Sequence, residues 1–234
     1  MIRLLSLFSL LLAAPVLAQD AAPPAAPETP APLAKPAPAT VAVVMDTAQG
    51  RITIALETER APITSRYILR HVDEKRLDGA AFYRAYKITP DGSLGLIQGG
   101  IRDGAKLLPP VAHEPTSTTG LTHDEGAISL ARGAPGTAQA QFFIILGKLD
   151  SLDANPAASG DNQGYAVFGR VTEGMDVVRK ILDQPISATK GEGAMKGQMI
   201  EAPVPILSVR RVVPLPPKPS PKAAPKPAAK RRPQ

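Results

Sequence analysis

Residues 81–98 read AFYRAYKITPDGSLGLIQ, and this stretch shows the pattern on which the whole fold is built. It consists of two β-rich runs, 81–88 and 94–98, on either side of the turn residues Pro90-Asp91-Gly92. Runs of the same kind, bounded by Gly, Pro and Asp, occur before and after it, at 41–47, 51–56, 127–131, 141–146, 165–171 and 204–213. The chain is therefore predicted to consist mainly of short strands.

Helical periodicity is found in only two segments. The first begins at Pro62, a residue that suits the first turn of a helix, and continues to about Lys75. The second is marked by apolar residues from Met175 to Leu182. Many short strands and two helices predict a mainly β fold, a closed antiparallel barrel capped by both helices.

The two ends of the chain differ in composition from the domain between them. Residues 1–18 combine Arg3, an apolar run and the ending Val16-Leu17-Ala18. This pattern predicts a signal peptide for export to the periplasm, with an uncleaved N-terminal anchor as the alternative. Residues 19–40 and 214–234 are rich in proline and have little to bury, so we expect a disordered linker and a disordered basic tail. The folded domain is predicted to span 41–213.

The positive charge is concentrated in the tail. The chain has a formal net charge of +6, and residues 214–234 contain six basic residues and no acidic one. Residues 1–213 therefore carry 21 basic and 21 acidic residues. The domain has no basic excess to meet phosphates, so nucleic acid is not an expected partner.

Several kinds of site chemistry are not supported by the sequence. The chain has no cysteine, which removes disulfides, thiolate nucleophiles and thiolate metal sites. Its three histidines, His71, His113 and His123, do not form a metal-ligand pattern, and His71 is predicted to lie on the solvated side of the first helix. No phosphate loop and no G-x-S-x-G turn is present. If the protein is an enzyme, it is therefore predicted to work without metal, cofactor or covalent nucleophile.

A series of motifs in residues 41–213 resembles the cyclophilin family. In chain order the motifs are Phe82-Tyr83-Arg84, Leu96-Ile97-Gln98-Gly99-Gly100, Gly126 to Arg132 (GAISLAR), Gln141-Phe142-Phe143-Ile144, Leu152-Asp153 and Gly164 to Gly169 (GYAVFG). The last of these is similar to bacterial periplasmic members. The resemblance implies an eight-stranded antiparallel barrel closed by two helices, and peptidyl-prolyl cis/trans isomerisation of a peptide bound in a groove on the outer face.

The resemblance also assigns roles to single residues. Arg84 matches the catalytic arginine, which donates to the prolyl nitrogen in the twisted transition state and so stabilises it more than the planar ground state. Gln98 is assigned with it to catalysis, and both Gln98 and Gln141 are expected to bind the peptide backbone and orient Arg84. The positions that match the substrate-binding groove are Ala131, Arg132, Gln141, Phe143, Leu152 and Tyr165.

The chain departs from the family pattern at three places near this groove. An insert of roughly Tyr86 to Leu94 separates Arg84 from Gln98, Gly95 replaces a pocket phenylalanine, and Ser151 replaces an aromatic residue. Two apolar contacts are thus missing or are supplied by the insert. An active isomerase is the leading interpretation, and Gly95 and Ser151 are consistent with an alternative function, a non-catalytic module that binds Pro-containing segments. A third interpretation is that the domain is a tether for the basic tail, which binds anionic envelope polymers.

We predict that the protein is a monomer and that it acts on unfolded or loop X–Pro segments of client polypeptides.

Overall fold

The structure is a computed structural model that describes residues 37–212. The predicted signal peptide, most of the predicted linker and the basic tail lie outside the described residues. Among residues 37–212, no helix combines the length and the apolar character that a membrane span requires.

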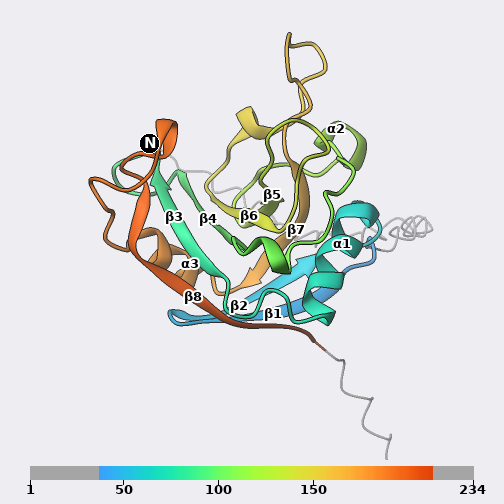
Figure 1. Cartoon of the computed structure of the whole chain (residues 1–234). Coiled ribbons are helices and arrows are strands. Elements are labelled where there is room, and N and C mark those ends of the chain that lie inside the picture. The colour runs from blue at the N-terminus through green and yellow to red at the C-terminus, as the bar shows by residue number, and fades with distance from the viewer. Residues whose placement is uncertain (1–36, 213–234) are drawn as a thin grey trace, which may run out of the picture. The chain divides into compact units, whose positions relative to one another are not determined.

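Eight antiparallel strands form a closed barrel, as Figure 1 shows. Around the barrel the strands follow the order β1-β2-β7-β5-β6-β4-β3-β8, and β8 pairs with β1 to close it. The strands are β1 Val41–Thr47, β2 Gly50–Leu56, β3 Ala81–Lys87, β4 Gly95–Gly100, β5 Ala127–Leu130, β6 Gln141–Leu146, β7 Ala166–Glu173 and β8 Met199–Arg211. The predicted mainly β fold, an eight-stranded antiparallel barrel, is confirmed.

Two amphipathic helices pack on the barrel, as the sequence predicted. Helix α1 (Pro62–Asp73) packs against β7 and β8, and α3 (Met175–Leu182) packs against β2, β3 and β4. The amino end of α1 is capped by the buried carboxylate of Glu114, which accepts from the backbone N–H groups of Ile63 and Thr64. A negative charge at this end complements the helix dipole. The short helix α2 (Thr116–Thr119) and three 3₁₀ turns, η1 (Gly104–Lys106), η2 (Asp150–Leu152) and η3 (Gly193–Met195), were not predicted.

The predicted solvated position of His71 is wrong. Its side chain is fully buried, and its Nδ1 donates to the carbonyl of Tyr67. The buried face of α1 includes Thr64 and Ser65 as well as Ile68, so it extends beyond the apolar residues. Because His71 follows Ile68 by three positions, it lies on this same face. The prediction considered only apolar residues, so the buried face that it gave to α1 was too narrow.

The interior of the barrel is filled by aromatic and branched side chains. Phe82 of β3 and Phe142 of β6 meet edge to face inside it, with ring centroids 5.8 Å apart. Adjacent strand residues point to opposite faces, so Phe143 projects from the barrel's outer surface. Strand β6 is buried on both faces for this reason.

An irregularity in β3 changes which residues face outward. The pairing of β3 with β4 shifts between Phe82 and Arg84, which makes Tyr83 the extra residue of a β-bulge. Phe82 and Arg84 would share a face in a regular strand. Here Phe82 is fully buried in the core, whereas Arg84 lies on the outer surface beside a cavity.

Candidate active site

A cavity of about 290 Å³ lies on the outer surface of the barrel beside β3, β4 and β6. It brings together seven of the eight residues that the resemblance assigned to the site: Arg84, Gln98, Ala131, Arg132, Phe143, Leu152 and Tyr165. The other lining residues are Tyr86, Ile88, Leu96, Leu149, Ser151 and Met195. Gln141, the eighth assigned residue, stands outside the lining and is joined to it by hydrogen bonds.

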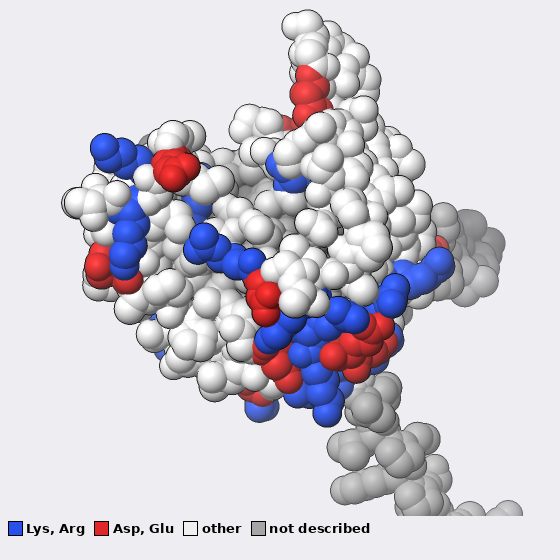
Figure 2. All heavy atoms as spheres, in the orientation of Figure 1, with Lys and Arg blue, Asp and Glu red and all other residues white. Residues whose placement is uncertain are grey.

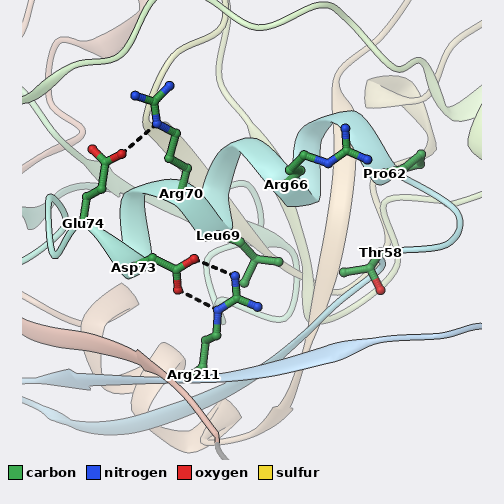
Figure 3. A pocket seen from close by; sticks show the side chains of 8 residues that line it. All are labelled: Thr58, Pro62, Arg66, Leu69, Arg70, Asp73, Glu74 and Arg211. Carbon is green, nitrogen blue, oxygen red and sulfur yellow. Dashed lines mark hydrogen bonds and ion pairs between the residues drawn. The ribbon is translucent and has the colours of Figure 1, made fainter.

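A larger concavity of about 420 Å³ runs along α1, away from these residues. Figure 3 shows that Arg211 pairs with Asp73 and that Arg70 pairs with Glu74. On this side of the molecule basic and acidic residues are interleaved (Figure 2). No aromatic side chain lines the α1 groove, and none of the residues assigned from the sequence lies in it.

The guanidinium of Arg84 is held on two sides by glutamine side chains. Its Nη1 donates to Oε1 of Gln98 at 2.8 Å, while its Nε and Nη2 donate to Oε1 of Gln198 at 2.8 and 2.6 Å. The ring of Tyr86 packs on the same guanidinium, with 5.8 Å between Cζ and the ring centroid. Burial lowers the pKa of Arg84, but an arginine remains charged at any pH at which the protein is folded.

Tyr83, the bulge residue, links the two glutamines that the sequence singled out. Nε2 of Gln98 donates to the Tyr83 hydroxyl at 3.0 Å, and this hydroxyl donates to Oε1 of Gln141 at 2.7 Å. Burial raises the pKa of Tyr83, which keeps the hydroxyl protonated and able to donate. Gln141 therefore has no direct contact with Arg84, and any influence it has on that residue passes through Tyr83 and Gln98.

The apolar wall of the cavity is built around Phe143. The edge of this ring meets Tyr165, with centroids 5.3 Å apart and an interplanar angle of 87°. Its other side stacks on the buried imidazole of His123. His123 in turn bonds to Asp153 through Nδ1 at 2.6 Å and to the Ser129 hydroxyl through Nε2 at 3.1 Å. A carboxylate only accepts hydrogen bonds, so Nδ1 donates to Asp153 and Nε2 accepts from Ser129.

Arg132 shapes the cavity mainly through contacts within the protein. Its guanidinium bonds to both carboxylate oxygens of Asp161 and to the carbonyl of Gly164. It also lies over the ring of Tyr165, 5.2 Å from the centroid. These contacts hold the segment Asp161–Gly164 and the aromatic ring that follows it.

The replacement at Gly95 has a steric cause. A Cβ at this position would be 2.5 Å from the backbone oxygen of Tyr86, so no side chain fits without opening the β3–β4 ladder. The insert supplies apolar contacts in its place, because Tyr86 and Ile88 both line the cavity. The insert closes a hairpin, in which the backbone N–H of Ile88 donates a hydrogen bond to the carbonyl of Leu94. Ser151 lines the cavity as an exposed residue and adds no apolar wall.

Some lining residues could have been found from the sequence and others could not. Tyr86 and Ile88 follow Arg84 at intervals of two, so strand alternation places them on its face. Met195 and Gln198 come from the segment between α3 and β8. Only the long-range pairing of β8 with β3 brings Met195 to the cavity and Gln198 to Arg84, and no local pattern marks either residue.

Comparisons with known proteins agree on one family. The family model "Cyclophilin type peptidyl-prolyl cis-trans isomerase/CLD" matches residues 42–211. A peptidyl-prolyl cis-trans isomerase of Acinetobacter baylyi is 34% identical over 174 residues, covering 72% of this chain and 84% of the relative. Peptidyl-prolyl cis-trans isomerase B of Escherichia coli is 32% identical over 143 residues, covering 59% of this chain and 82% of its own. The fold is shared with a solved cyclophilin-type isomerase of Cryptosporidium parvum, with a TM-score of 0.56 and 18% identity over 75% of this chain and 99% of that chain.

Proposed function

The chain belongs to the cyclophilin-type peptidyl-prolyl cis-trans isomerases, and we propose that Arg84 catalyses X–Pro rotation in exported polypeptides bound in the cavity described above. As a member of this family it is an enzyme, a peptidyl-prolyl cis/trans isomerase. One observation carries the assignment of Arg84: its guanidinium is fixed by two amide oxygens at the edge of an apolar cavity walled by Phe143.

The reaction requires stabilisation of a twisted amide. Resonance stiffens the C–N bond of an X–Pro peptide and gives a rotation barrier of ~18–20 kcal/mol. At the top of this barrier resonance is lost, so the prolyl nitrogen becomes pyramidal and accepts a hydrogen bond. A donor fixed beside that nitrogen binds the transition state better than the planar ground state and accelerates rotation.

The cavity has groups suited to both parts of this task. The apolar wall of Phe143, Leu152 and Tyr165 can receive the prolyl ring. Arg84 borders the same cavity and keeps one N–H on each of Nη1 and Nη2 beyond those bonded to the two glutamines. These free N–H groups are the donors that we propose meet the prolyl nitrogen.

The alternative of a non-catalytic binding module depended on Gly95 and Ser151. Steric exclusion at Gly95 explains its glycine without a loss of function, and Tyr86, Ile88, Leu96 and Met195 contribute apolar surface. Only Ser151 still supports the binding-module alternative.

The experiment that tests the proposed function is a protease-coupled isomerisation assay on an Ala-Pro peptide. Catalysis by the wild-type chain is expected, and an unaccelerated rate with peptide binding intact would favour the binding module.

The site of action is proposed from residues 1–18, whose charged start, apolar run and small-residue ending support export and removal of the segment. We propose that the mature protein begins near Gln19 and assists the folding of client polypeptides in the periplasm. N-terminal sequencing of protein from fractionated cells tests this. Recovery of Met1 on membrane-bound material would show that the segment remains as an anchor.

A further inference from the structure

The segment that joins α3 to β8 ends beside Arg84, at Gln198. The backbone of Gln198 is fixed there from two sides: its carbonyl accepts from Ala85 N at 3.0 Å, and its N–H donates to Met195 O at 3.1 Å. The next residue, Met199, is the β8 partner of Arg84. The side chain of Gln198 therefore starts from a defined position next to the bulge in β3.

From this position a single amide oxygen fixes the orientation of the guanidinium. Oε1 of Gln198 accepts from both Nε and Nη2 of Arg84, at 2.8 and 2.6 Å. Gln98 accepts from Nη1, on the other side of the planar group. Rotation of the guanidinium out of its plane would break at least one of these bonds. The N–H groups left for substrate consequently point in fixed directions.

Both acceptors are neutral, and this matters for an arginine that must act through its charge. Within residues 37–212, no carboxylate accepts a hydrogen bond from Arg84 or forms an ion pair with it. A carboxylate at the place of Gln198 would hold the guanidinium as firmly but would offset its charge. Amide oxygens orient the group and leave its charge available to the transition state.

We propose that Gln198 is a positioning residue for Arg84 in the isomerase reaction. The inference rests on the proposed function of Arg84, and it concerns a residue that no sequence motif marks. It predicts that loss of the Gln198 oxygen lowers turnover without weakening peptide binding, because the apolar wall of the cavity remains unchanged.

The test compares Gln198→Met, Gln198→Glu and a control, Gln184→Met, in the full-length chain. Methionine keeps the length of the side chain but lacks the acceptor. Gln184 is a half-buried glutamine of the same segment whose amide bonds to Lys180 O and not to Arg84. The measurements are kcat/KM on an Ala-Pro peptide, peptide Kd by titration, and the solvent exchange of the Arg84 Nε–H by NMR.

We expect Gln198→Met to lower kcat/KM about tenfold to hundredfold, as misplacement of a catalytic group does, while Kd changes less than about twofold. Gln198→Glu should recover part of the rate, because a carboxylate oxygen takes up the same two bonds. The Arg84 Nε–H should exchange slowly in the wild type and in Gln184→Met, and faster in Gln198→Met.

Equal kcat/KM in Gln198→Met and the wild type would overturn the proposal, as would an Nε–H that exchanges equally fast in both. A fall in rate that is matched by weaker peptide binding would also overturn it. An inactive wild type would refute the proposed function instead. In that case the NMR comparison alone decides whether Gln198 holds Arg84.

Discussion

The imidazole of His123 lies almost parallel to the ring of Phe143, with 13° between the planes and 6.0 Å between the centroids. His123 is fully buried and anchored by Asp153 and Ser129, so it forms a rigid support behind the wall that faces the cavity. The wall of the cavity beside Arg84 is thus supported by a polar network in the protein interior.

Arg84→Ala should lower kcat/KM by two to three orders of magnitude, equivalent to the ~3–4 kcal/mol typical of losing one preorganised donor. Arg84→Lys should recover little, because a flexible ammonium cannot keep two fixed N–H directions. Thermal stability should change little in either variant. Arg66→Ala, on the exposed face of α1 (Figure 3), serves as the control and should retain full activity. Intact activity in Arg84→Ala would refute the assignment of this residue.

Phe143→Leu and Phe142→Leu form a matched pair, because the two neighbouring side chains point to opposite faces of β6. Both should lower the free energy of unfolding, by about 1 kcal/mol or more, since both rings are buried. Only Phe143→Leu should also weaken peptide binding, roughly tenfold, which corresponds to about 1.4 kcal/mol. Denaturant unfolding and peptide titration separate the two effects. Equal affinities in both variants would show that Phe143 does not contact the substrate.

Tyr83→Phe should lower kcat/KM about tenfold while leaving the barrel intact. The substitution removes one oxygen and leaves Nε2 of Gln98 and Oε1 of Gln141 without their partner. Gln98 can then turn its amide and release Nη1 of Arg84. The rate should be compared with the melting temperature, which we expect to fall only slightly. An unchanged rate would mean that Gln98 holds its orientation without Tyr83.

Stability should fall as the pH drops from about 7 to 5.5, because burial lowers the pKa of both His71 and His123. The two side chains take up protons less readily in the folded protein than in the unfolded chain, where they bind protons below about pH 6.5. Protons therefore favour the unfolded state in this window, by up to about 1.4 kcal/mol per pH unit for each histidine. The effect is absent above the unfolded pKa.

His71→Leu should flatten this pH dependence of the melting temperature. The buried Nε2 of His71 has no hydrogen-bond partner, so a proton placed there would remain unpaired. His113→Leu is the control, because the hydrogen bond of the His113 ring to Gln163 O is exposed. Equal slopes in the wild type and in His71→Leu would show that His71 takes up its proton equally well in both states.

A chain of residues 37–213 should fold as stably as the full-length chain, whereas one of residues 41–213 should be slightly less stable. Ala39 donates its N–H to Glu59 Oε2 and accepts from Thr58 Oγ1. These contacts are exposed, so their loss should cost about 0.5–1 kcal/mol. Thermal unfolding of both chains checks this. A failure of the 37–213 chain to fold would show that the flanking segments are needed.

The sequence predicted the strands well because their signals are local. Alternation and turn residues placed seven of the eight strands close to their observed bounds, and motif order placed Arg84, Gln98 and Phe143 at one cavity. What could not be predicted depends on pairing between distant segments. Strand β8 begins at Met199 and not near 204, because Met199 pairs with Arg84 across the bulge. The approach of Gln198 follows from the same pairing, and the roles of the site residues remain predictions.

The extra residue in β3 also limits how this site can be transferred to another protein. A designer who copied Arg84 and its glutamine partners onto a regular barrel, without an additional position for Tyr83, would direct the guanidinium into the hydrophobic interior. Deletion of Tyr83 from the natural chain should have the same result, because Phe82 and Arg84 would no longer be separated by the bulge and one of them would have to leave its face. A substitution in this strand leaves its two faces in place, whereas the gain or loss of a residue beside Tyr83 would exchange the core positions with the cavity-facing positions.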